Sequence, residues 1–112
     1  MSLNERLVKM LDGLTKEPAA AESYNGPEAE YLVFNYTEIP DDFGDDEPGH
    51  YRQLIQVHLF STPERDITGL RRKIRRRIIG AGFTAPTVVP ASDQNGQHLV
   101  FEFEGVEGAK DG

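Results

Sequence analysis

One stretch of the sequence changes its hydrophobic period, and this change constrains the fold of the rest. In residues 53–60 the aliphatic side chains Ile55, Val57 and Leu59 alternate with polar ones, which is typical of a strand with one buried face. Beyond Pro63, apolar residues recur every three or four positions, as in an amphipathic helix. The sequence therefore predicts a strand followed by a helix at the centre of the domain. The apolar stripe of that helix is Ile67, Leu70, Ile74 and Ile78.

The predicted helix spans residues 66–79, and most positions outside its apolar stripe are cationic. Asp66 stands before the stripe as the expected N-cap, and Gly80 and Gly82 follow it as stop signals. Seven of the twelve Lys and Arg residues lie between positions 65 and 77, so positive charge is concentrated here. We expect this basic face to bind a partner or a neighbouring subunit through Arg71, Arg72, Arg75 and Arg76.

The remaining elements are predicted from the same patterns. Four aliphatic side chains at helical spacing indicate a helix within residues 1–16, capped by Ser2 or Asn4. Aliphatic and aromatic runs predict strands at residues 30–36, 84–91 and 97–104. The strand at 84–91 contains two prolines and is therefore placed at a sheet edge. An Asn-Gly pair at positions 95–96 predicts a tight turn before the last strand, and residues 105–112 are expected to form a flexible tail.

These elements predict one α+β domain over residues 1–112. Its sheet should have four mostly antiparallel strands, with both helices packed on one face. The order along the chain is α-β-β-α-β-β.

Residues 37–50 are predicted to form a long acidic loop between the first two strands. Two prolines and two glycines interrupt them, and six of the nineteen Asp and Glu residues fall between positions 38 and 47. These carboxylates are oxygen ligands of the kind that calcium prefers, but their spacing lacks the pattern of a calcium-binding EF-hand loop, so we expect no metal. The loop is instead a candidate interface through Asp41, Asp42, Phe43, Asp45 and Asp46.

The sequence argues against several classes of function. The chain has no cysteine, which removes disulfides, thiolate nucleophiles and cysteine zinc sites. It has neither an apolar run of about 18 residues nor the order of a signal peptide, so we expect a cytoplasmic protein with no membrane partner. No serine lies in a nucleophile-elbow sequence. His58 and His98 could share one sheet face as a two-histidine metal site, but exposed polar residues are the commoner interpretation. We therefore expect neither an enzyme nor a cofactor.

Three interpretations of the basic helix are left open. Its arginines could contact nucleic-acid phosphates, although the net charge of −7 and the acidic segment argue against this partner. They could form a solvated face whose cations favour the C-terminal end of the helix. They could also form a self-complementary interface, in which the helix of one subunit meets residues 41–47 of its neighbour. Head-to-tail pairing of this kind closes a ring.

Three segments give the chain a family resemblance: residues 39–43, residues 54–60, and residues 96–98 leading into the last strand. Together with the intervening sequence, they make residues 31–104 resemble small prophage-encoded tail proteins of long-tailed phages. More specifically, this region looks like the tail terminator, also called the tail completion protein, which caps the tail tube. Head–tail connector and minor tail proteins share the same size and class.

The resemblance implies a small α+β subunit that assembles as a ring, commonly a hexamer. Such a ring stops polymerisation of the tail tube and presents a surface for joining the filled head. Its partners would be the tube and the head-completion proteins, in the host bacterial cytoplasm during assembly and later in the virion tail. The family has no fixed interface motif, so the resemblance assigns no role to any individual residue.

Overall fold

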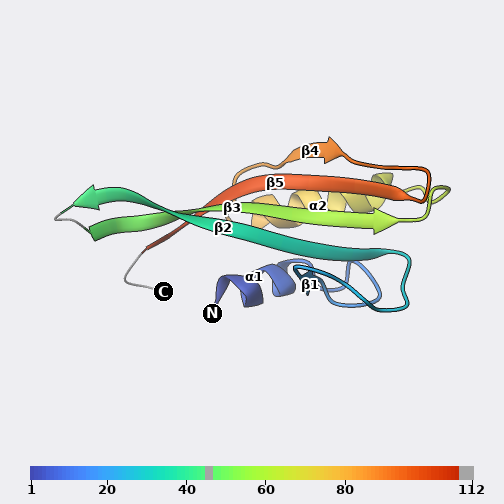
Figure 1. Cartoon of the computed structure of the whole chain (residues 1–112), viewed down its shortest axis with the longest axis horizontal. Coiled ribbons are helices and arrows are strands. Elements are labelled where there is room, and N and C mark those ends of the chain that lie inside the picture. Colours follow the sequence, from blue (N-terminus) through green and yellow to red (C-terminus); the bar gives the residue numbers. More distant parts are fainter. Residues whose placement is uncertain (45–46, 109–112) are drawn as a thin grey trace.

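Two helices and a five-stranded mixed sheet make up an α+β fold (Figure 1). The computed structural model describes residues 1–44 and 47–108, and within them the side chains of residues 1–40 and 51–106. The elements in chain order are α1 (Leu3–Met10), β1 (Ala20–Ala21), β2 (Tyr31–Gly44), β3 (Glu47–Ser61), α2 (Thr68–Gly80), β4 (Thr87–Pro90) and β5 (Gln97–Gly108).

The α+β class and the mostly antiparallel sheet are confirmed, but the predicted count of four strands is wrong. The strands lie in the order β1-β2-β3-β5-β4, with β4 at one edge as predicted. All pairs are antiparallel except β1 and β2, which run parallel with Ala20 opposite Val33. Strand β1 has only two alanines, too few to show the alternation by which a strand is recognised in sequence.

The helix ends differ from the predictions in detail. Ser2 caps α1, because its Oγ accepts the Glu5 amide at 3.1 Å, and the helix ends at Met10. The N-cap position of α2 is Ile67, and the prediction that Asp66 occupies it is wrong. The Asp66 carboxylate nevertheless accepts the amide of Thr68 at 3.0 Å, and this hydrogen bond lowers the pKa of Asp66.

The end of α2 follows the predicted glycine stop. Gly82 has a positive φ of 92°, a conformation that residues with a Cβ rarely adopt. The Gly82 amide donates to the Ile79 carbonyl at 3.1 Å, and the Phe83 amide donates to the Ile78 carbonyl at 3.4 Å. These two bonds are the Schellman motif, which reverses the chain and returns Phe83 to the sheet.

The tight turn before β5 lies where it was predicted, but its geometry differs. Asp93 and Gly96 exchange backbone hydrogen bonds of 3.1 and 3.3 Å. Neither Asn95 nor Gly96 has the positive φ that the Asn-Gly pair suggested. The Asp93 carboxylate accepts the Asn95 amide at 2.8 Å instead, so an aspartate-capped turn replaces the expected one.

One face of the sheet forms the core, and both helices cover it as predicted. Alternate residues of the central strands, among them Phe34, Val57 and Phe101, are fully buried on this face. Leu7 of α1 and Ile78 of α2 belong to the same buried cluster. In Figure 1, α2 lies behind the sheet, so the opposite face, which we call the front face, has no helix over it.

The prediction of an acidic loop over residues 37–50 is wrong for the described part of that segment. Strand β2 continues to Gly44 and β3 begins at Glu47, with Ile39 opposite Arg52 and Phe43 opposite Pro48. The predicted tail also begins too early, because β5 continues to Gly108. Residues 45–46 and 109–112, which include Asp45 and Asp46, lie outside the described residues.

Backbone pairing explains why a segment with this composition is extended. The Phe34 carbonyl accepts the Glu22 amide on the outer side of β2, and backbone groups point to that side at every second residue. Pro40 therefore faces the outer edge, where no strand follows in the described part of the sheet. The missing N–H of proline removes no ladder hydrogen bond at this position.

The strand ends project beyond the layer of helices as an arm, formed by residues 38–44 of β2, 47–52 of β3 and 106–108 of β5 (Figure 1). The molecule measures 54 × 23 × 23 Å, and its radius of gyration is 15.2 Å. A compact chain of this length would have a radius of gyration of about 13 Å. The arm therefore makes the molecule markedly elongated.

Gly105 lies at the joint between the arm and the body, opposite Gln53 of β3. A Cβ at this position would lie 2.7 Å from two ring carbons of Phe83 and 2.8 Å from Oε1 of Gln53. The Phe83 ring also packs edge-on against Phe103, with 5.3 Å between ring centroids. The joint therefore has no room for a side chain at residue 105.

We predict that Gly105→Ala lowers the free energy of unfolding by about 1–3 kcal/mol, because the added methyl group overpacks the Phe83 contact. Urea denaturation measures this change. Gly69→Ala in α2 is the matched control, since nothing lies within 4 Å of its Cβ position. It should raise the stability by about 0.5–1 kcal/mol. Equal stabilities for Gly105→Ala and the parent chain would contradict the packing at the joint.

Candidate functional site

The basic face of α2 is fully exposed, as the apolar stripe predicted. Ile74 and Ile78 are completely buried against the sheet. The four predicted contact residues lie on the outer surface of the helix: Arg71, Arg72, Arg75 and Arg76.

No described ion pair neutralises these four arginines. The ion pairs among the described side chains are Lys16–Glu28, Arg52–Glu104 and Arg65–Glu30, and none of them involves α2. Arg77 has a different role. Its Nη1 donates to the carbonyl oxygens of Met10 at 2.9 Å and Asp12 at 3.1 Å, which ties α2 to the end of α1.

The described part of the predicted acidic segment lies at the far end of the arm from α2. Asp41, Asp42 and Phe43 belong to the last residues of β2, and their side chains are outside the described part. Figure 1 shows this end of β2 well separated from α2 along the length of the molecule. The fold therefore does not bring the basic helix and the described part of the acidic segment together within one chain.

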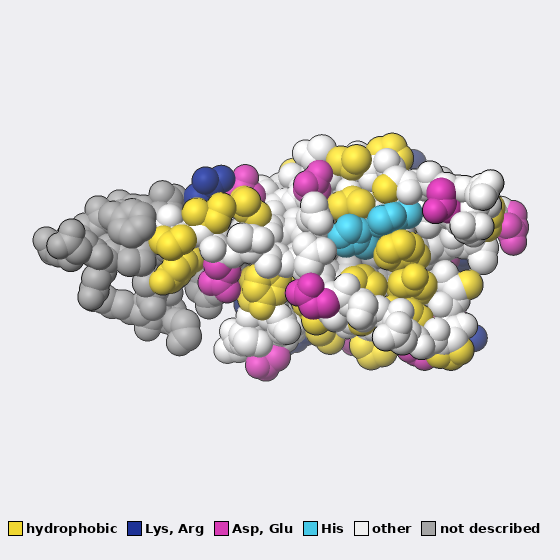
Figure 2. Space-filling model, viewed as in Figure 1, with side chains coloured by type: hydrophobic (Ala, Val, Ile, Leu, Met, Phe, Trp, Pro, Cys, Tyr) yellow, Lys and Arg dark blue, Asp and Glu magenta, His cyan; other side chains and the backbone are white. Residues whose placement is uncertain are grey.

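A row of stacked rings crosses the front face and was not predicted from the sequence. Tyr24 stacks on Tyr31, with 4.4 Å between ring centroids, and Tyr31 stacks on Phe60 at 4.9 Å. Phe60 stacks on His98 at 4.1 Å, and His98 contacts His58 at 5.1 Å. In Figure 2 the histidines lie in the middle of the face, with hydrophobic side chains beside them. Two valines on this face, Val33 and Val100, are buried.

The two histidines are in direct contact. Nδ1 of His58 lies 2.8 Å from Nε2 of His98, so one imidazole must donate and the other accept. Partial burial lowers the pKa of both residues, and the nearby His98 lowers that of His58 further, against the opposing effect of Glu102. Both rings therefore favour the neutral state that this hydrogen bond requires.

The histidine pair corresponds to the two-histidine metal site that the sequence offered as an alternative. Its members do share one face, as that alternative required. However, no three histidine, aspartate or glutamate side chains come together as a possible metal site in the part of the chain that the structure describes. Two ligands alone are fewer than a structural zinc site uses.

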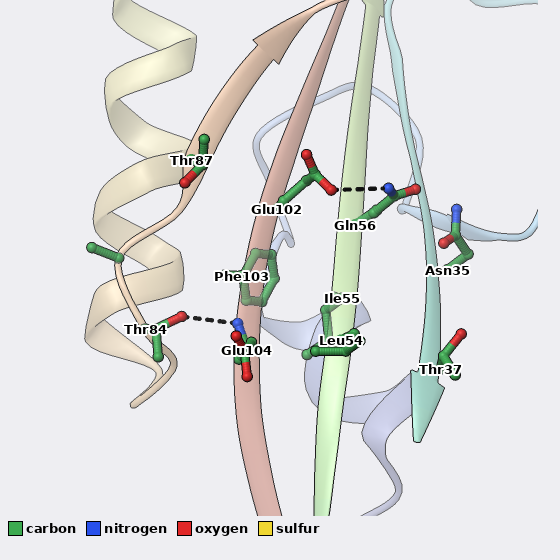
Figure 3. A pocket seen from close by; sticks show the side chains of 11 residues that line it. Asn35, Thr37, Leu54, Ile55, Gln56, Thr84, Thr87, Glu102, Phe103 and Glu104 are labelled. Atoms are coloured by element: carbon green, nitrogen blue, oxygen red, sulfur yellow. Dashed lines mark hydrogen bonds between the residues drawn. The ribbon is translucent and has the colours of Figure 1, made fainter. Parts of the chain in front are cut away.

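A groove runs beside the histidines on the front face and has a volume of about 690 Å³ (Figure 3). Its lining includes Leu54 of β3, Glu102 and Glu104 of β5, and Thr84 from the segment before β4. The Thr84 Oγ1 accepts the Glu104 amide at 2.8 Å, and Gln56 Nε2 donates to Glu102 at 3.3 Å. Among the residues whose side chains the structure describes, no Lys or Arg lines the groove.

The two faces of the molecule therefore differ in charge. The front face carries Glu102 and Glu104, with Arg52 donating to Glu104 at 2.8 Å. Few Lys and Arg side chains are visible on this face in Figure 2. The opposite face carries the exposed arginines of α2, a helix without any acidic residue. This arrangement favours contact between unlike faces of two molecules.

Neither helix in the described ranges is long and apolar enough to cross a membrane. No protein-family model matches the chain, and comparison with curated proteins gives no match. The candidate site consequently rests on the geometry of the two faces.

We predict that the stability of the folded protein falls as the pH decreases from about 7.5 to 5.5. The folded-state pKa values of His58 and His98 lie below the unfolded value of about 6.5, so the unfolded chain takes up protons first. The stabilisation is complete above that unfolded value and is lost as the pH falls towards the folded values. Urea denaturation across this range measures the effect.

Replacing both residues, His58→Gln with His98→Gln, should flatten the pH dependence in this window. His50→Gln is the matched control, because His50 belongs to the arm and not to the front-face pair. An unchanged slope in the double variant would show that the pair does not cause the pH dependence.

Proposed function

We propose that the chain is a structural subunit of a phage tail, the tail terminator, which caps the tail tube as a ring and helps join it to the head. The family resemblance of residues 31–104 suggests this role. The observation that carries it is the arm, a projecting three-stranded extension that no described helix covers. Projecting arms of this kind suit contacts between neighbouring subunits, because they reach beyond the core of their own chain.

The charges of the subunit support assembly by head-to-tail contact. Arg72 and Arg76 have no described ion pair within the chain, and the arm ends in an acidic sequence on another part of the molecule. A contact between different surfaces of identical subunits repeats around an axis and closes as a ring when the rotation permits. In this role the protein acts by shape and charge, without catalysis. It would assemble in the host bacterial cytoplasm and remain in the virion tail.

The first test is the solution mass by light scattering at low and high salt. We expect a mass several times the 12.5 kDa of one chain, near that of a hexamer, which falls as salt screens the charged contact. The reversal Arg72→Glu with Arg76→Glu should give smaller species at every salt concentration. The control Lys9→Glu, matched to the single reversal Arg76→Glu, changes the net charge equally outside α2 and should assemble normally. A 12.5 kDa species at all concentrations would contradict assembly by the chain alone.

The exposed arginines of α2 also support a second candidate, a small nucleic-acid-binding regulator. Phosphate contacts by these residues would make the affinity for DNA fall steeply with salt concentration. Titration of labelled duplex DNA at two salt concentrations tests this function. Retention of the affinity by the Arg72→Glu and Arg76→Glu variant would exclude the basic helix as its cause.

A further inference from the structure

The outer surface of α2 carries a mixed stripe as well as a positive charge. Four of its side chains follow one another at spacings of three, one and three residues, so they lie on one side of the helix. They are Arg72, Arg75, Arg76 and Ile79. Ile79 has 41% of its surface exposed and is one of the few large apolar side chains left in solvent. This stripe offers a partner three positive charges and one apolar side chain.

The groove of Figure 3 has the complementary features. Glu102 provides negative charge along one side, next to Glu104, whose carboxylate is paired with Arg52, and Leu54, with 37% of its surface exposed, provides an apolar surface in the middle of the sheet. The apolar surface continues onto the base of the arm. There Ile39 and Val106 flank Arg52 across the three strands and are 36% and 65% exposed.

We propose that the groove on the front face receives α2 of a second copy of this chain. In this contact, arginines of the incoming helix pair with Glu102 and Glu104, and Ile79 packs against Leu54. The inference rests on the proposed ring and names the two surfaces that meet in it. It assigns the main acidic partner of α2 to the groove rather than to the end of the arm.

A second copy is the occupant that the charges of the chain favour. The acidic groove and the basic stripe lie on opposite faces of the sheet, because α2 packs behind the core while the groove opens in front. One molecule cannot bring them together, whereas two molecules stacked front to back can. Each subunit then still has one free groove or one free helix, so the contact propagates until a ring closes.

Cysteine cross-linking tests this contact directly, because the chain has no cysteine of its own. Glu102→Cys and Arg76→Cys are made as separate variants, one of them carrying a size tag, and are mixed in equal amounts under mild oxidation. Residues 76 and 102 are both exposed, so neither change disturbs the core. We expect the ratio of the disulfide-linked heterodimer to the two homodimers to be several-fold higher than random pairing would give. The excess should fall at high salt.

The matched control mixes Glu64→Cys with Arg76→Cys, since Glu64 is an exposed acid in the loop after β3. This mixture should give the statistical distribution of dimers. If the Glu102→Cys mixture gave the same distribution as the control, the proposal would be overturned.

Two further outcomes separate this inference from the proposed function. An excess of the heterodimer, together with a parent chain that never reaches the mass of a ring, would support the groove contact and reject the closed ring. A ring without that excess, but with an excess from Asp42→Cys mixed with Arg76→Cys, would make the arm the partner of α2. That result would overturn the groove and leave the proposed function standing.

Discussion

Strand β3 determines most of this structure, because it pairs on both sides along nearly its whole length. Residues between Glu47 and Phe60 are matched to β2 on one side, and those from His50 to Ser61 are matched to β5 on the other. The strand provides hydrogen-bond partners for the backbone N–H and C=O groups of its neighbours in both the body and the arm. Its alternate side chains belong to different surfaces, with Val57 completely buried in the core and Leu54 lining the front groove. A single run of residues thus defines both the core and the proposed interface.

The elements that could be predicted from the sequence are those in which burial of one face leaves a periodic pattern of apolar residues. The alternation around Val57 and the helical spacing of Ile74 and Ile78 predicted a strand and a helix, and all three side chains are fully buried. The exposure of the α2 arginines followed from the same stripe, because a helix that buries one face presents the other. Local chemistry also placed the end of α2 at its glycines and the last turn at Asp93–Gly96.

The features that were missed depend on pairing between distant residues. The composition of residues 37–50 favours a loop, but the segment forms parts of two adjacent strands that pair with each other. Pro40 faces the edge of the sheet, where its missing N–H removes no hydrogen bond between strands. The ring stack and the groove arise from register, which sets Phe60 beside His98 and Leu54 beside Glu104 although about forty or fifty positions separate them. No pattern within a single element encodes such a match.

A small change of angle at Gly105, the joint of the arm, would produce a larger displacement at the end of the arm. Six residue steps of β3 separate Gln53 from Glu47, which is a span of about 20 Å at the usual rise of a strand. A rotation of about 10° at the joint would therefore displace the end of the arm by about 4 Å. The Phe83 ring packs against Gly105 at this joint and leaves no room for a side chain there. The direction in which the arm leaves the body thus depends on a contact between one aromatic ring and one glycine at the base of the arm.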